Sequence, residues 1–169
     1  MTRYDEHSGA WRADRVGSAL LGTNPTVLRR LQQSFAVIGD VQFLPGYSVV
    51  IVDRAGVDRL SDLPRSDRLR FLEDLERTAE AVERACSTTD SAFRRVNVEI
   101  LGNTDPFLHV HVWPRFGWEP AELMGKPVWL YPPERWSDPA TGLGPQHEEL
   151  RDRITAELDR AVGTSSTDR

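Results

Sequence analysis

The stretch from Phe107 to Trp113 reads FLHVHVW, in which leucine and valine alternate with histidine and aromatic residues. Successive side chains of a β-strand point to opposite faces, so residues two apart share a face. The alternation therefore predicts a half-buried strand with two different faces. The core-facing set is Leu108, Val110 and Val112, and the opposite set is Phe107, His109, His111 and Trp113.

Other short β-rich runs surround one long helical pattern. Turn residues bound these runs, at Pro45-Gly46 and at 102–106. The long pattern carries apolar residues at helical spacing from about 66 to 86. Together they predict an α+β class: a mostly antiparallel sheet of about five strands, one long central helix and a C-terminal helix. The predicted strands lie at 35–38, 47–52, 94–101 and 107–113.

The flanking segments complete the predicted organisation. Asn24-Pro25 is typical of a helix start and predicts a short helix over 24–33, after another short helix within 11–21. Gly163 is expected to cap the C-terminal helix. We expect one domain over 11–163, divided into a core at 34–116, an irregular aromatic-rich segment at 114–145 and a C-terminal helix at 146–162. A flexible lead at 1–10 and a disordered tail at 164–169 are expected around it.

Charge and composition exclude some classes of partner. The formal net charge is −5, which argues against a nucleic-acid binder, whereas a small phosphorylated ligand needs only a few local donors. No apolar run reaches the ~20 residues of a membrane span, and the N-terminus has no apolar signal segment. The expectation is a cytoplasmic protein without a membrane or nucleic-acid partner. The single cysteine, Cys86, is expected in the core.

The two histidines on one strand face allow three interpretations. They can be ordinary solvated or packed side chains. They can be two ligands of a metal ion, with Glu99 on the preceding strand as the best further ligand. They can also act in covalent catalysis, where one imidazole attacks a phosphate and the other stabilises its oxygens. Spacing alone leaves all three open.

The run RVNVEILGNTDPFLHVHVWPRF, residues 95–116, resembles the signature of the histidine triad (HIT) superfamily. The details, with a later Pro127-Val128-Trp129, resemble the branch labelled diadenosine-polyphosphate-hydrolase-like. Anchoring on Pro114-Arg115 places His109 on the middle, nucleophilic histidine of the triad and His111 on the third. Phe107 stands where the first histidine is expected. The resemblance covers about residues 34–116.

The resemblance implies hydrolysis at the α-phosphate of a nucleotide derivative through a nucleotidyl-histidine intermediate. The implied substrate is a dinucleoside polyphosphate or a nucleoside phosphoramidate, and the chemistry requires no metal or cofactor. His109 and His111 would be catalytic, and a homodimer is expected. Implied substrate-binding residues are Asn97, Gly102, Asn103, Thr104 and Phe107, together with Asp40, which is either a ribose ligand or a simple turn residue. Arg115 is either a phosphate contact or an ordinary surface residue.

Three alternatives remain at this point. A nucleotidyl transferase or phosphorylase would use the same intermediate. A nucleotide-binding module without turnover is suggested by the missing first histidine. A metalloenzyme would use His109, His111 and Glu99.

Overall fold

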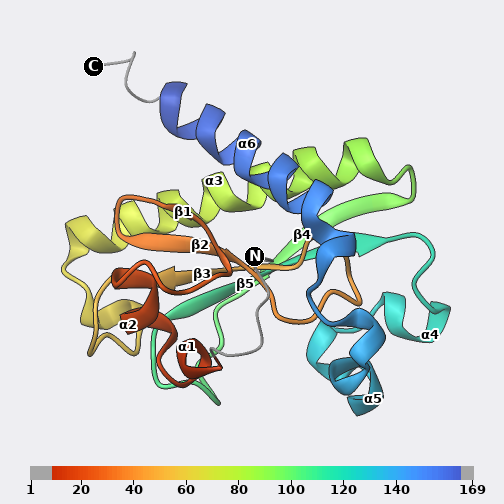
Figure 1. The fold of residues 1–169 in the computed structure, drawn as a ribbon, viewed down its shortest axis with the longest axis horizontal. Coiled ribbons are helices and arrows are strands. Elements are labelled where there is room, and N and C mark those ends of the chain that lie inside the picture. Colours follow the sequence, from red (N-terminus) through yellow and green to blue (C-terminus); the bar gives the residue numbers. More distant parts are fainter. Residues whose placement is uncertain (1–8, 165–169) are drawn as a thin grey trace.

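The computed structural model describes residues 9–164, which form an α+β fold (Figure 1). Five antiparallel strands make one sheet in the order β1-β2-β3-β5-β4. The strands are β1 (Val27–Arg30), β2 (Ser34–Ile38), β3 (Ser48–Val52), β4 (Phe93–Glu99) and β5 (His109–Phe116). The α-helices are α1 (Ala10–Ala13), α2 (Arg15–Leu20), α3 (Arg65–Thr89), α4 (Ala121–Met124), α5 (Pro133–Ser137) and α6 (Glu148–Thr164). Short 3-10 helices are η2 (Leu60–Asp62), η3 (Val128–Leu130), η4 (Pro139–Thr141) and η5 (Pro145–His147).

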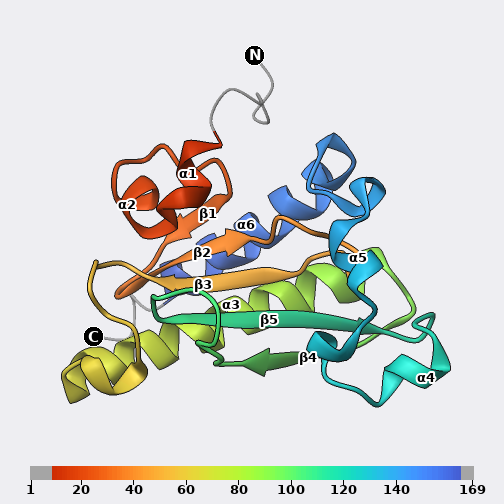
Figure 2. The same cartoon turned by 90° about the horizontal axis from the view of Figure 1, so that it is seen from below.

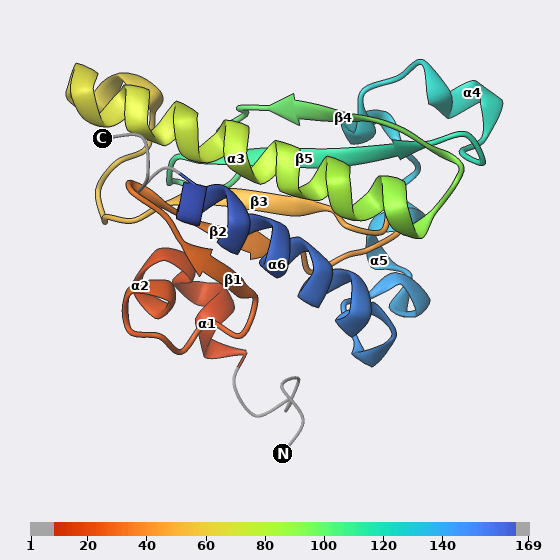
Figure 3. The same cartoon turned by 90° about the horizontal axis from the view of Figure 1, so that it is seen from above.

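Helices α3 and α6 cover one face of the sheet, and Figure 3 shows them lying across it. Their apolar stripes meet the core-facing side chains of β5 in one cluster. The members of this cluster include Leu108, Val110 and Val112 of the β5 segment, Phe71 and Val82 of α3, and Ile154 and Leu158 of α6. The predicted fold class and the predicted parity of the Phe107–Trp113 strand are therefore confirmed. The opposite face of the sheet, with the histidines, is left free of long helices (Figure 2).

A buried carboxylate fixes α3 to the edge of the sheet. The Asp74 side chain accepts hydrogen bonds from the backbone N–H of Gln32 and Gln33, at 3.2 and 2.7 Å, and from Ser34 Oγ at 2.9 Å. These donors belong to the turn between β1 and β2 and to the first residue of β2. A buried carboxylate that satisfies backbone donors substitutes for the water that those groups lose on folding.

The predicted helix over 24–33 is wrong, because Val27–Arg30 forms β1 and pairs with β2. The Asn24 side-chain oxygen accepts from the backbone N–H of Thr26 at 3.0 Å and from Thr26 Oγ1 at 2.6 Å. Asparagine followed by proline thus makes a local turn rather than a helix cap. The chain that follows pairs with β2, whose backbone provides hydrogen-bond partners for β1. An isolated short helix would have no such partners.

The remaining boundaries differ in smaller ways. The predicted helix within 11–21 is divided at Asp14, whose side chain accepts from Gly17 N at 2.8 Å and so starts α2. Gly163 is not a cap, because α6 continues through it to Thr164. Ala10 begins α1, while the rest of the predicted lead and tail, 1–8 and 165–169, lies outside the described residues. No helix within residues 9–164 combines the length and apolarity needed to cross a membrane.

Arg115 organises the segment that follows β5. It is buried, and both its Nε and Nη2 bond the Glu119 carboxylate. Nη1 donates to the Lys126 carbonyl at 3.2 Å, and Nη2 reaches the carbonyls of Leu123 and Met124. The interpretation of Arg115 as an ordinary surface residue is therefore wrong, since Arg115 is buried and holds the α4 loop onto the sheet.

The turn before β3 gives a matched test of packing. A Cβ on Gly46 would lie 2.5 Å from Cys86 Sγ, whereas one on Gly56 would meet nothing within 4 Å; both glycines have positive φ, +94° and +76°. We expect Gly46→Ala to lower the free energy of unfolding by about 2–4 kcal/mol, because it adds overpacking to backbone strain. Gly56→Ala should cost about 1–2 kcal/mol, from the backbone alone. Urea denaturation measures both, and equal losses would contradict the close packing at Gly46.

Candidate active site

Two cavities are lined by both His109 and His111. The first, of about 200 Å³, is lined by residues of α2, of η3 and of α5. The second, of about 310 Å³, lies under the loop from Leu101 to Asp105. His109, His111, Asp105 and Trp129 line both, so the two cavities meet at the histidines. The remaining lining of the first includes Arg15, Asp40, Tyr47, Phe107 and Trp136, and that of the second includes Gly102, Asn103 and Thr104.

His109 is held by a hydrogen bond to its own strand. Its Nδ1 lies 2.8 Å from the carbonyl oxygen of Phe107. A carbonyl only accepts, so Nδ1 must carry a proton. We therefore assign neutral His109 a proton on Nδ1 and a lone pair on Nε2. That lone pair is the nucleophilic position of the ring.

His111 has the opposite arrangement. Its Nδ1 lies 2.8 Å from the Tyr47 hydroxyl. Burial, followed by the nearby carboxylate of Asp40, raises the pKa of Tyr47 far above its usual value, so the phenol keeps its proton and can donate it. Burial and the neighbouring His109 lower the pKa of His111 to about 4. Neutral His111 then accepts at Nδ1 and carries its proton on Nε2, as a donor.

Aromatic contacts fix the orientation of His111. Trp113 stacks on Tyr47 with ring centroids 3.6 Å apart and planes within 8°. Trp129 meets the His111 ring edge-on at 4.8 Å. Trp113 is buried and also stacks on His111, so the imidazole ring cannot rotate without displacing neighbouring indoles.

The hydrogen bond of the Glu99 carboxylate goes to a tryptophan and not to a histidine nitrogen. Its Oε2 accepts from the indole Nε1 of Trp113 at 3.2 Å. Within residues 9–164 no group of three or more His, Cys, Asp or Glu side chains is placed to hold a metal ion. The geometry found at His109 and His111 is that of hydrogen-bonded imidazoles.

All but one of the predicted substrate-binding residues line a cavity that also contains the two histidines. The loop residues Gly102, Asn103 and Thr104 line the second cavity with both histidines, and Phe107 and Asp40 line the first. The Phe107 ring centroid is 5.0 Å from that of His109. Asn97 lines a different cavity, without either histidine.

Asp40 is bound by two arginines. Arg15 donates to both carboxylate oxygens at 3.1 and 2.7 Å, and Arg12 Nε donates at 3.2 Å. A carboxylate offers about four acceptor positions, so these bonds leave about one for a ligand hydroxyl. Asp40 is therefore more than a simple turn residue, because its ion pair with Arg15 attaches α2 to the cavity wall.

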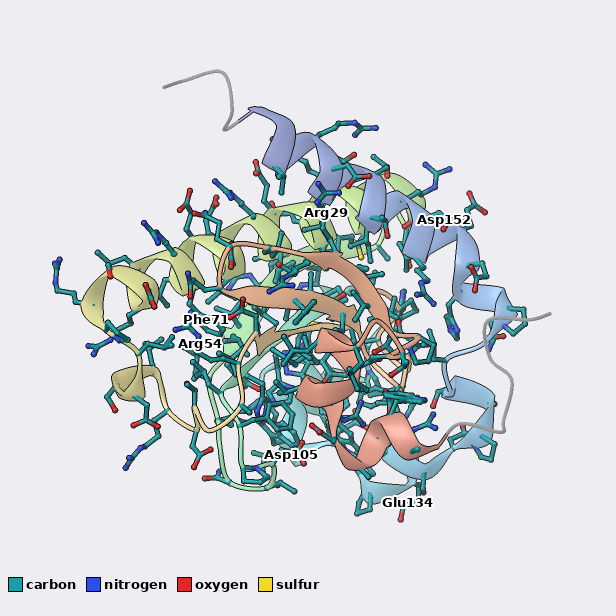
Figure 4. All side chains as sticks on the ribbon, turned by 60° about the vertical axis from the view of Figure 1, so that its left-hand side comes forward. Arg29, Arg54, Phe71, Asp105, Glu134 and Asp152 are labelled. Atoms are coloured by element: carbon teal, nitrogen blue, oxygen red, sulfur yellow. The ribbon has the colours of Figure 1, made fainter. Side chains whose placement is uncertain are left out.

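Sequence reasoning missed Arg15, Tyr47 and Asp105. Tyr47 could have been found by parity: Val49 pairs with His111 and Ile51 with His109, so Tyr47 belongs to the same face. Asp105 was treated only as a turn residue, yet it lines both cavities and is labelled on its loop in Figure 4. Nothing in the local sequence of Arg15 signals its role, because the pair with Asp40 spans 25 residues.

The depressed pKa of His111 has a consequence for stability. Between its ordinary value of 6.5 and about 4, the unfolded chain binds a proton at this ring and the folded chain does not. Stability contributed by His111 is therefore present above pH 6.5 and is lost as the pH falls toward 4. We expect wild type to lose roughly 2 kcal/mol more than His111→Gln between pH 7 and about pH 4.5. Urea unfolding at both pH values measures this, and parallel losses would contradict a neutral buried His111.

Comparison with known proteins identifies the fold. No protein-family model matches the sequence, and no curated protein matches it. Solved structures do match. A histidine triad protein from Sinorhizobium meliloti aligns with a TM-score of 0.63 and 20% identity, over 78% of this chain and 87% of the other. One from Marinobacter aquaeolei aligns with a TM-score of 0.60 and 21% identity, over 82% and 88%.

A third match is described as a hypothetical histidine triad nucleotide-binding protein from Sulfolobus tokodaii. Its TM-score is 0.56 and its identity is 12%, over 80% of this chain and 84% of the other. At such identities the likeness concerns the fold. The five-stranded sheet, its two long helices and the histidine strand thus form the fold of the histidine triad proteins.

Proposed function

We propose that the protein is a HIT-family nucleotide hydrolase that acts at the α-phosphate of a dinucleoside polyphosphate or a nucleoside phosphoramidate. The observation that carries this proposal is the 2.8 Å hydrogen bond between His109 Nδ1 and the Phe107 carbonyl. It leaves Nε2 with a lone pair beside two cavities. The likeness to solved histidine triad structures, one of them described as nucleotide-binding, supports the same chemistry.

In the first step, the Nε2 lone pair of His109 attacks the α-phosphorus and forms an N–P bond. The P–O or P–N bond to the leaving group breaks, and the leaving group departs with that electron pair and takes a proton from solvent. Negative charge on the phosphoryl oxygens is stabilised by the Nε2–H of His111. The loop residues Gly102, Asn103 and Thr104 supply further donors from the second cavity.

In the second step, water attacks the phosphorus and releases the nucleotide, while the N–P electron pair returns to Nε2 of His109. The water proton passes to solvent. Transfer instead of hydrolysis needs only a different acceptor at this step. Asp40, with about one acceptor position free, binds a ribose hydroxyl, and Phe107 packs beside the nucleophile.

One observation favours a second candidate function. Phe107 occupies the first triad position and offers no proton to a leaving group. A nucleotide-binding module without turnover would show affinity but no release of product.

We also propose a homodimer. Strand β4 is an edge of the sheet, and two large apolar side chains beside it are exposed, Val98 by 49% and Ile100 by 44%. Apolar groups on an unpaired edge are typical of a surface that pairs with another chain.

The nucleophile is tested by His109→Asn, with His147→Asn as the control histidine outside both cavities. We expect a loss of about 10³-fold or more in kcat, with nucleotide affinity unchanged within about threefold. His147→Asn should retain both. Intact mass after rapid quenching should show one nucleotidyl group on wild type and none on His109→Asn. Full turnover by His109→Asn would contradict the mechanism, and affinity without any turnover in wild type would support the binding module.

The Tyr47 hydroxyl is tested by Tyr47→Phe. Without the O–H donor, His111 is no longer held with its proton on Nε2, and we expect kcat to fall about tenfold with KM nearly unchanged. A merely structural role would instead lower the unfolding free energy and leave kcat per folded molecule intact. Steady-state kinetics together with urea denaturation separate the two.

A further inference from the structure

Trp129 is a large aromatic side chain that stays exposed where the two histidine cavities meet. It belongs to η3 and is 41% exposed, and it lines both cavities together with His109 and His111. No residue of β4 lines either cavity. The ring therefore borders spaces that are separate from the strand edge to which the dimer is assigned.

Buried neighbours on both sides hold the backbone of Trp129. Val128 belongs to the hydrophobic core, and the Tyr131 hydroxyl accepts a hydrogen bond from Arg115 Nη2 at 2.9 Å. The amide of Tyr131 also donates to the Val128 carbonyl at 2.9 Å, which closes the short turn around Trp129. The exposed indole is thus presented to the cavities from an anchored segment, as a preorganised binding surface requires.

The ring contacts of Trp129 leave one of its faces without a stacking partner. Trp136 stacks on the indole with centroids 5.1 Å apart and planes within 8°. His111 and Trp113 meet it at steep angles, 79° and 87°. Within residues 9–164 these three are the rings that contact Trp129, so only one parallel ring covers it.

The other exposed tryptophan of the chain, Trp118, is different. It is 47% exposed, but it stacks on Phe116 at 4.8 Å, and its Nε1 donates to Asp90 at 2.9 Å. Trp118 lines neither histidine cavity. The indole N–H of Trp129 makes no hydrogen bond within the described chain. An exposed aromatic ring beside a cavity, with its polar group unused, is typical of a ligand-binding surface.

We propose that Trp129 is a specificity-determining residue that stacks on the base of a nucleotide ligand. The proposal rests on the nucleotide chemistry proposed above. A base on the uncovered face of Trp129 would extend its stack with Trp136, and such stacking accepts any planar base. Because Trp129 borders both cavities, this base belongs either to the transferred nucleotide or to the leaving nucleotide of a dinucleoside polyphosphate.

The test measures binding in His109→Asn, where turnover does not disturb the equilibrium. NMR titration compares diadenosine tetraphosphate, which carries a base at each end, with ribose 5-phosphate, which carries none. Adding Trp129→Ala should weaken binding of the dinucleotide about tenfold and leave ribose 5-phosphate within twofold. Trp129→Phe keeps a smaller ring and should recover most of the loss. The matched control, Trp118→Ala, should bind both ligands like its parent.

AMP identifies which base stacks on Trp129. If Trp129→Ala weakens AMP as much as the dinucleotide, the base is that of the transferred nucleotide. If it weakens the dinucleotide and spares AMP, the base is that of the leaving nucleotide. Both results support the proposal. A wild type that binds the dinucleotide through Trp129 but releases no product would contradict the proposed hydrolase and leave the role of Trp129 intact.

Other outcomes would overturn the proposal. Equal weakening of the dinucleotide and ribose 5-phosphate by Trp129→Ala would mean that the indole acts only through the orientation of His111. Unchanged binding of both ligands, or no binding of the dinucleotide to wild type at millimolar concentration, would remove the stacking role. A change of mass in solution for Trp129→Ala, without an effect on ligand binding, would assign the ring to contact between two copies of the chain.

Discussion

The hydrogen bond from His109 Nδ1 to the carbonyl of Phe107 determines what this strand can do. It is local, because it joins residues two apart, and it decides which ring nitrogen keeps its lone pair. His111 has the opposite protonation, because the hydroxyl of Tyr47, next to the neighbouring strand β3, donates to its Nδ1. When both imidazoles are neutral, the pair presents one acceptor, Nε2 of His109, and one donor, Nε2 of His111. Such a pair can form a bond to phosphorus and stabilise its oxygens without the repulsion that two charged rings would suffer.

Sheet pairing provides the setting for that pair. Strand β3 places Tyr47 on the histidine face, and β4 places Glu99 against Trp113, so both neighbours of β5 stabilise the site. The other side of β5 packs on α3 and α6. Arg115 then ties the following loop to the sheet and so helps to position the segment that carries Trp129. Core packing on one face thus fixes the polar chemistry on the other.

Local patterns were sufficient for much of this structure. The alternation at Phe107–Trp113, the apolar stripe of α3 and the turn at Pro45-Gly46 each act within a few residues, and they predicted the strands, the helix and the face of the histidines. Strand β1 was missed because its conformation depends on pairing with β2 rather than on its own residues. Arg15 and the cavity at Asn97 were missed for a similar reason: both depend on segments that are distant in the sequence.

The opposite protonation of the two rings is the central claim, and ¹⁵N NMR of the histidine side chains tests it most directly. Long-range ¹H–¹⁵N correlations at neutral pH distinguish a protonated ring nitrogen from a bare one. The expected result is a proton on Nδ1 of His109 and on Nε2 of His111, with the His111 pattern persisting to about pH 4. A proton on Nε2 of His109 would contradict the account, because that nitrogen could then not attack phosphorus.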